Sequence, residues 1–97
     1  MSDVHPTHHD HPNHQAIIKR LKRAEGHLRS TLGMMEVHRP CLELAQQLHA
    51  VEKAICQAKR LLIRDHLDHC LDSAMDADDV SARNKALDEF REITRYL

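Results

Sequence analysis

Aromatic and turn-forming residues are scarce in this chain. Its 97 residues include no Trp, one Phe and one Tyr, together with only two Gly and three Pro. Strands favour aromatic residues and tight turns favour Gly and Pro, so this composition argues against a β-rich domain. A chain of this length forms one small domain, whose limited core makes association between protomers expected.

The sequence also lacks a long apolar run and a secretory signal. We therefore expect no membrane partner and a cytoplasmic location. Three cysteines are an odd number, which argues against a disulfide framework. In a reducing compartment the free thiols are available to bind metal ions, and ten histidines strengthen that interpretation.

Charge is segregated along the chain, although the formal net charge is only -1. Residues 17–30 contain five basic side chains and one acidic side chain. Residues 65–79 contain six aspartates and neither Lys nor Arg. Such asymmetry indicates that the basic segment contacts a polyanion.

A His-rich tail and three helices are expected. Residues 1–14 show no hydrophobic periodicity, so we expect a flexible, metal-prone tail before a helical domain over residues 15–97. Apolar residues at three-, four- and seven-residue steps predict long helices over residues 15–36 and 40–74. A turn over residues 75–79 then leads to a third helix, capped by Asp79 or Ser81, with one apolar face: Leu87, Phe90, Ile93 and Leu97.

The two long helices carry more apolar surface than one protomer can cover. Pairing two such hairpins in antiparallel fashion gives a four-helix bundle. The sequence therefore predicts an all-α fold, with a three-helix protomer that associates at least as a dimer.

Cys41, His66 and Cys70 are candidate metal ligands. His66 and Cys70 are four residues apart, so they share a helical face and can bind one metal ion. Cys41 lies 25 residues before His66 on the same predicted helix, roughly 37 Å away along its axis. One site containing all three residues must therefore take Cys41 from a second, antiparallel protomer. The bundle expected from the apolar pattern brings the same residues together.

Ordinary packing competes with this interpretation for each residue taken singly. A cysteine is often a small buried apolar side chain, and this explanation is the better one for Cys56. Two thiolates and an imidazole suit Cu(I), whereas an added nitrogen from the tail suits square-planar Ni(II). Zn(II) accepts the same four ligands, so ligand identity alone does not choose the metal. A filled coordination shell would leave no position for a small-molecule substrate, which argues against an enzyme.

Residues 18–29, Cys41, residues 46–51, His66 and Cys70 together resemble the family of copper-sensitive operon repressors and nickel/cobalt repressors (CsoR/RcnR). The resemblance extends over essentially the whole chain except the His-rich tail. It implies an all-α repressor without a helix-turn-helix, assembled as a dimer of dimers. Such a tetramer would hold operator DNA without its inducer and leave the DNA when the inducer binds.

The resemblance also implies roles for single residues at the metal site. Nickel and cobalt members add an N-terminal histidine, and His9 stands at a matching distance before Cys41. Glu89 matches a carboxylate that supports the metal ligands of copper sensors from outside the coordination shell. Pro40 replaces the tyrosine usual in copper sensors, which favours Ni(II) or Co(II) as inducer, with Cu(I) as the alternative.

Arg20 and Arg60 match the positions with which the family contacts DNA. The other candidates for phosphate contacts are Lys19, Arg23, Lys53, Lys59 and Arg64. A solvated helix face is the ordinary explanation for such charges, but the basic excess over residues 17–30 favours DNA. Because no aromatic platform or recognition helix is present, binding should depend on phosphate contacts and DNA shape and weaken with salt.

The sequence thus predicts a metal-responsive homotetrameric repressor that is released from operator DNA by Ni(II) or Co(II). Two other interpretations remain beside the copper sensor. One is a formaldehyde-responsive repressor, although relatives of that kind typically lack the last cysteine, here Cys70. The other is a metal-buffering helical bundle that binds no DNA, which would have no need of the basic segment.

Overall fold

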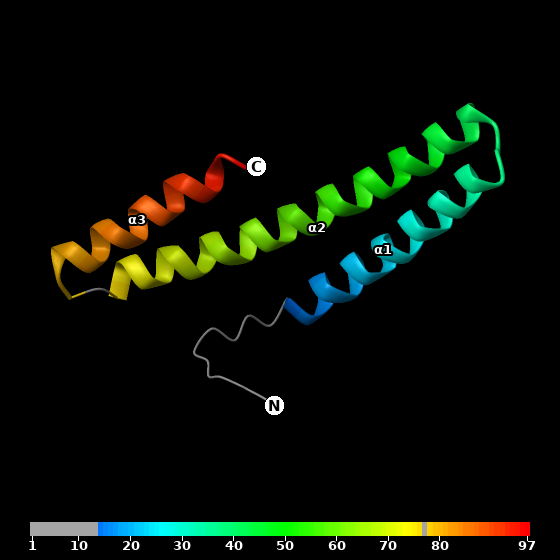
Figure 1. The fold of residues 1–97 in the computed structure, drawn as a ribbon. Coiled ribbons are helices and arrows are strands. Elements are labelled where there is room, and N and C mark those ends of the chain that lie inside the picture. The colour runs from blue at the N-terminus through cyan, green and yellow to red at the C-terminus, as the bar shows by residue number, and fades with distance from the viewer. Residues whose placement is uncertain (1–13, 77) are drawn as a thin grey trace. The chain divides into compact units, whose positions relative to one another are not determined.

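The computed structural model describes residues 14–76 and 78–97 of the chain. These residues form three helices and no strand, namely α1 (His14–Glu36), α2 (Cys41–Asp76) and α3 (Val80–Thr94) (Figure 1). The all-α prediction is confirmed. The ends of α1 and α2 fall within two residues of the predicted ones, and the predicted His9 ligand lies outside the described residues.

The end of α1 is a Schellman motif. The amide of Arg39 donates to the carbonyl of Met34, and the amide of His38 donates to that of Met35. His38 has a positive φ of 59°, the left-handed conformation that this motif usually assigns to glycine. Pro40 then lies just outside α2, and its carbonyl accepts the amide of Leu44.

Asp79 caps the start of α3. Its side chain accepts a hydrogen bond of 2.6 Å from the amide of Ala82, which selects Asp79 over Ser81 as the N-cap. The helix ends at Thr94, and the remaining amides bond to carbonyls three residues back. Leu97 therefore lies beyond the helix with its side chain exposed, so the prediction that it continues the apolar face was wrong.

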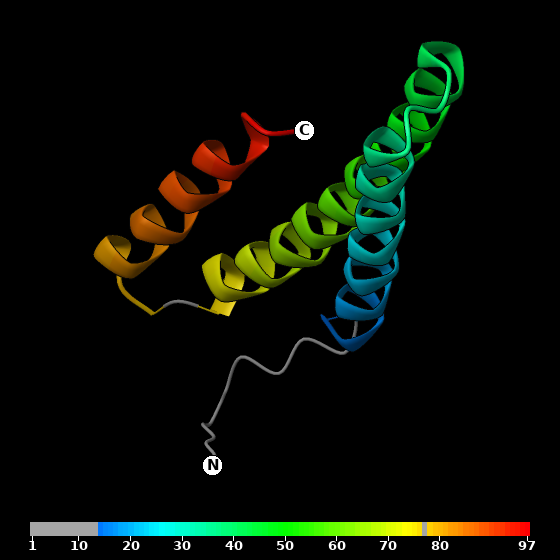
Figure 2. The same ribbon diagram turned by 45° about the vertical axis from the view of Figure 1, so that its right-hand side comes forward.

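The chain divides into two compact units, and α2 contributes residues to both. The first unit extends to Ala58, and Figures 1 and 2 show α1 beside the first part of α2. Its buried residues are spaced by seven on each helix, which places them on one face: Ile17, Ala24 and Thr31 of α1, with Val51 and Ala58 of α2.

The second unit begins at Lys59 and contains the rest of α2 together with α3. Among its described residues, the buried ones all come from α2: Ile63, Cys70 and Ala74. No residue of α3 is fully buried, and Leu87, Phe90 and Ile93 are only half-buried. The third helix is therefore held by a shallower apolar contact than α1.

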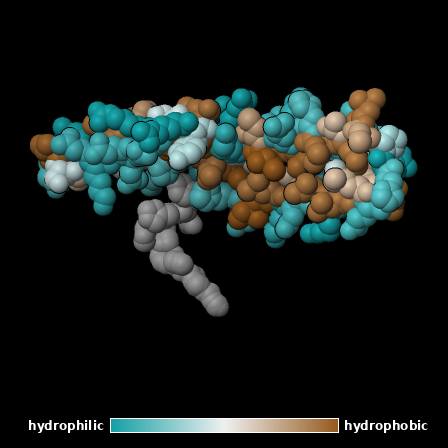
Figure 3. Space-filling view, turned by 45° about the horizontal axis from the view of Figure 1, so that its top comes forward, coloured by the Kyte–Doolittle hydropathy of each residue, from teal (hydrophilic) through white to brown (hydrophobic). Residues whose placement is uncertain are grey.

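Much of the predicted apolar pattern stays exposed in the protomer. On α1, five large apolar side chains are 39–53% exposed: Ile18, Leu21, Leu28, Leu32 and Met35. On α2, Leu48, Ile55 and Leu62 are 40–45% exposed and are again spaced by seven residues. Figure 3 shows apolar side chains gathered over the part of the molecule formed by α1 and the first part of α2. Surface of this kind is characteristic of an interface between protomers.

Candidate metal centre and nucleic-acid interface

Three metal-binding side chains meet in the second unit. One donor atom each of His66, Cys70 and Glu89 lies within 4.8 Å of the other two. His66 and Cys70 are one helical turn apart on α2, and Glu89 approaches them from α3. Donors of a tetrahedral zinc site lie about 3.3–3.8 Å apart, given metal–ligand bonds of 2.0–2.3 Å. The cluster therefore needs only small movements to bind a metal ion.

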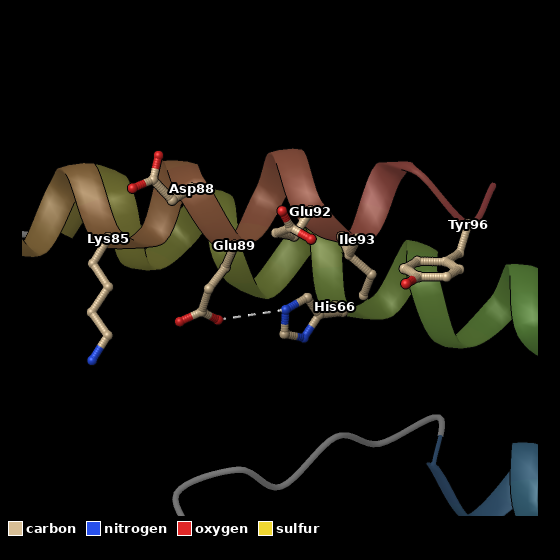
Figure 4. Close-up of a pocket in the computed structure, with 7 residues that line it drawn as sticks. All are labelled: His66, Lys85, Asp88, Glu89, Glu92, Ile93 and Tyr96. Carbon is tan, nitrogen blue, oxygen red and sulfur yellow. Dashed lines mark ion pairs between the residues drawn. The ribbon is translucent and has the colours of Figure 1, made fainter.

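Glu89 faces the imidazole of His66. Its Oε2 lies 3.8 Å from Nε2 of His66, and the two side chains point toward each other in Figure 4. The side chain of His66 is partly buried, whereas that of Glu89 is more than half exposed. A carboxylate at this position can either orient the imidazole or bind a metal ion itself.

Cys70 is the buried member of the cluster. Burial, and then the negative charge of Glu89, raise the pKa of the Cys70 thiol above its ordinary value. The thiol is therefore protonated at neutral pH in the metal-free protein. A metal ion has to displace this proton, because the thiolate is the form that binds metals.

A shallow cavity of about 360 Å³ opens beside His66. Its other walls come from α3 and the residues after it: Lys85, Asp88, Glu89, Glu92, Ile93 and Tyr96 (Figure 4). Three carboxylates against one ammonium give this cavity an acidic rim. It offers a cation a solvent-filled approach to the histidine.

Cys41 is not part of this cluster. It occupies the first position of α2, is exposed, and belongs to the first compact unit. Cys56 is half-buried on the same helix and is also outside the cluster. A site combining Cys41 with His66 and Cys70 therefore remains a prediction that requires a second protomer.

The resemblance implied only a supporting role for Glu89, outside the coordination shell. Nothing in the local spacing places Glu89 at the distance of a donor, because the contact depends on how α3 packs against α2. The acidic turn between the two helices was visible in the sequence, but its path was not.

A basic pocket lies in the first unit. Arg20, Arg23 and His27 of α1 line a cavity of about 180 Å³, which Ala24, Ala54 and Gln57 complete. A ring nitrogen of His27 lies 2.6 Å from Oε1 of Gln47, and this hydrogen bond ties α1 to α2. The structure thus brings together two of the predicted DNA contacts, Arg20 and Arg23.

The other predicted DNA contacts do not line this pocket. Lys19 and Lys53 are exposed elsewhere on the first unit. Lys59, Arg60 and Arg64 are exposed on the part of α2 that belongs to the second unit. Among the described helices, none combines the length and the apolar character needed to cross a membrane.

Residues 13–96 match the protein family described as metal-sensitive transcriptional repressor. The copper-sensing transcriptional repressor CsoR of Bacillus subtilis (strain 168) is 35% identical over 80 residues, which cover 81% of this chain and 79% of that protein.

A more distant relative and a solved structure give the same classification. The copper-sensing transcriptional repressor CsoR of Mycobacterium ulcerans (strain Agy99) is 34% identical over 61 residues, which cover 63% of this chain. That match spans only 52% of the mycobacterial protein. The nickel-responsive transcriptional regulator InrS is 32% identical, with a TM-score of 0.75 over 94% of this chain and 100% of the solved one.

Proposed function

The chain belongs to the metal-sensitive transcriptional repressors of the CsoR/RcnR type, and from this we propose that it binds operator DNA without metal and releases it on binding Ni(II) or Co(II). The protein is thus a metal-sensing transcriptional repressor. Members of the family are repressors and not enzymes. This confirms the prediction from the sequence that the protein is not an enzyme. The identity of the metal, the ligands and the assembly are the parts that we propose.

The observation that carries the proposal is the convergence of His66 and Cys70 on one face of α2, with a carboxylate beside them. We assign these two residues as ligands in one protomer and Cys41 as the ligand from a second protomer. His9, which lies outside the described residues, is proposed as the fourth ligand. Two thiolates with two nitrogens are a donor set that suits square-planar Ni(II).

The exposed apolar residues of α2 support an antiparallel pairing. Leu48, Ile55 and Leu62 follow Cys41 at steps of seven residues, and His66 follows Leu62 by four. These steps keep all five residues near one helical face. An antiparallel α2 from a second protomer that covers this face would bring its own Cys41 toward His66. We propose a dimer built in this way, two of which form a homotetramer.

The basic pocket of the first unit is the proposed start of the DNA interface. Arg20 and Arg23 are placed to hold a phosphate, and Arg60 provides a further contact on α2. The remaining proposed phosphate contacts are Lys19, Lys53, Lys59 and Arg64. A repressor that acts on bacterial-type operator DNA works in the cytoplasm, where we place this protein.

Inducer binding would act on DNA through α1. Drawing His9 toward the metal pulls on the start of α1, the helix that carries Arg20 and Arg23. Couplings between two ligands are typically about 1–3 kcal/mol per site, so the several sites of a tetramer suffice for release.

Cu(I) is the second candidate inducer, favoured by a specific observation. Two relatives that this chain resembles along much of its length are copper-sensing repressors. Cys41, His66 and Cys70 alone would form the trigonal site that Cu(I) prefers, and the tail would then take no part. The nickel-responsive neighbour supports the other choice.

An anaerobic titration distinguishes these candidates. The metal-free protein first selects its operator from a random DNA library, and Ni(II) or Cu(I) is then added while fluorescence anisotropy reports DNA release. Release by Ni(II), with a thiolate charge-transfer band that disappears in His9→Ala, supports the nickel sensor. Release by Cu(I) alone, unchanged in His9→Ala, makes the protein a copper sensor. If neither metal releases DNA, metal-driven release is wrong and a thiol-reactive inducer such as formaldehyde takes its place.

A further inference from the structure

His66 and Glu89 face each other from α2 and α3 without a hydrogen bond between the two atoms that lie nearest. At 3.8 Å, the distance between Nε2 and Oε2 is longer than a hydrogen bond between these atoms, which rarely exceeds about 3.2 Å. It is also somewhat longer than the separation of about 3.3–3.5 Å between a nitrogen and an oxygen that bind one tetrahedral zinc ion. A small movement of the half-exposed Glu89 side chain would bring both atoms to the separation of two ligands of one ion.

The same protomer supplies the third donor. Cys70 lies one turn from His66, and its sulfur lies within 4.8 Å of the other two donor atoms. One nitrogen, one sulfur and one carboxylate oxygen form a donor set that zinc sites commonly use. Copper(I) favours soft thiolate ligands, so the carboxylate makes this set a poor one for that ion.

The surroundings suit a dication. The thiolate of Cys70 and the carboxylate of Glu89 together neutralise a charge of +2. Asp88 and Glu92 line the adjoining cavity, where Lys85 is the one basic side chain other than the proposed ligand His66. The cavity leaves room for a water molecule as the fourth ligand of a tetrahedral ion.

We propose that His66, Cys70 and Glu89 of a single protomer bind Zn(II), and that this binding leaves the protein on its DNA. The inference rests on the proposed function, because the inducing site uses the same His66 and Cys70. The two binding modes differ in the third donor, which is Glu89 of the same protomer or Cys41 of a second one. The zinc mode recruits neither Cys41 of a second protomer nor His9, so it neither links two protomers nor pulls on the start of α1.

This arrangement gives the protein a means of rejecting Zn(II) by geometry. A sensor that relied on affinity alone would respond to zinc, which binds strongly to thiolate and imidazole ligands. Here Zn(II) occupies the sensing ligands in a mode that has no bridge between protomers. The choice of metal is then made by which third donor the ion recruits.

The test counts sulfur ligands in the full-length protein loaded with one Zn(II) per protomer. Zinc X-ray absorption should show one sulfur per ion, whereas a site that includes Cys41 would show two. Chelator competition then measures the zinc affinity of variants. We expect Glu89→Gln to weaken zinc binding about 10- to 100-fold and Cys41→Ala to leave it unchanged.

Two controls make these values interpretable. Glu92→Gln removes the charge of a carboxylate in the same cavity without touching a proposed ligand, so it should weaken zinc binding far less than Glu89→Gln. His66→Ala removes the site but keeps the tail, so it measures the zinc that the tail histidines hold by themselves.

The outcomes separate this proposal from the proposed function. Two sulfurs per zinc, or a zinc affinity lost in Cys41→Ala and kept in Glu89→Gln, overturns the single-protomer site. So does release of DNA by Zn(II) as complete as that by Ni(II) or Cu(I). Failure of both Ni(II) and Cu(I) to release DNA overturns the proposed function, while a one-sulfur zinc site dependent on Glu89 would still stand.

Discussion

The two compact units of the chain differ in the chemistry they expose. Residues 14–58 carry seven basic and four acidic side chains, whereas residues 59–97 carry seven basic and nine acidic ones. The first unit contains the arginine-lined pocket, and the second contains the cluster of metal donors. The arginine-lined pocket and the donor cluster thus lie in different units, although three proposed DNA contacts of α2 (Lys59, Arg60 and Arg64) belong to the second unit. Since α2 belongs to both units, it is the covalent link between them.

The two units also differ in how firmly their helices are packed. In the first, α1 and α2 each bury residues at seven-residue steps, and the hydrogen bond between His27 and Gln47 joins them. In the second, α3 buries no residue completely, and it carries Glu89. Elements with few buried apolar contacts open at low free-energy cost. Glu89 therefore sits on the less firmly packed helix, whereas His66 and Cys70 sit on α2, where Cys70 is buried.

The largest effect is expected from Cys70→Ser, which should abolish the response to metal while leaving DNA binding by the metal-free protein intact. Loss of the buried thiolate should weaken inducer binding by at least about 100-fold and abolish metal-driven release of DNA. The DNA affinity of the metal-free protein should not change, because Cys70 is outside the basic unit. Anisotropy titrations with and without metal measure both quantities.

Cys56→Ser is the matched control for that experiment. Cys56 is a half-buried thiol of the same helix, outside the donor cluster, so its replacement should preserve metal-driven release. If both substitutions abolished release equally, a general change in α2 would explain the result better than the loss of a ligand.

The second prediction concerns the apolar face that the protomer leaves exposed. Ile55 is 45% exposed in the protomer, so Ile55→Asp should leave the fold of the protomer intact. In a dimer paired along α2, each copy would bury one charge and lose burial worth about 1.5–3 kcal/mol. We expect dissociation to smaller species in sedimentation velocity, with metal-driven release lost in consequence.

Met75→Asp tests whether the effect belongs to this face. Met75 is 82% exposed on α2 and does not follow the seven-residue series. It should leave the assembly unchanged. Equal dissociation in both variants, or in neither, would contradict the proposed pairing along Leu48, Ile55 and Leu62.

The same face shows what the sequence could and could not predict. The period of the apolar residues predicted the helices correctly, because a helix must place such residues on one side in any environment. The same period predicted a single apolar stripe along α1. In the protomer, Ile17 and Ala24 of this stripe are buried, whereas Leu21 and Leu28 are exposed. Which half of a stripe meets which neighbour depends on the rotation of each helix, and periodicity carries no information on that rotation.

The metal donors likewise divide into two that the sequence could predict and one that it could not. His66 and Cys70 could be paired from the sequence because a four-residue step has a fixed geometry within one helix. Glu89 is on another helix, 23 residues after His66, and reaches it only because α3 turns back after Asp79. Contacts within an element are local and predictable, whereas contacts between elements require the tertiary fold.

The third prediction concerns the basic unit. Arg20→Ala should weaken binding to operator DNA about 10-fold and lower the salt dependence of binding by about one phosphate contact. Metal affinity should remain that of the wild type, since Arg20 is not among the donors. Arg91→Ala, which removes an exposed arginine of α3 paired with Asp88, is the control for loss of a positive charge. An equal loss of DNA affinity in both variants would contradict the proposed phosphate contact of Arg20.

The smallest effect is expected from the N-cap of α3. Asp79→Ala removes the acceptor for the amide of Ala82 and should destabilise the helix by about 1 kcal/mol. Because α3 holds Glu89, faster amide hydrogen exchange along α3 should accompany a few-fold loss of zinc affinity, with DNA binding unchanged. Asp79→Asn keeps an acceptor at the cap but removes its charge, so it should behave nearly as the wild type. If Asp79→Ala loosened α3 and zinc affinity nevertheless stayed constant, Glu89 would have no part in holding the ion. The two units would then differ only in charge, and metal binding would depend on α2 alone.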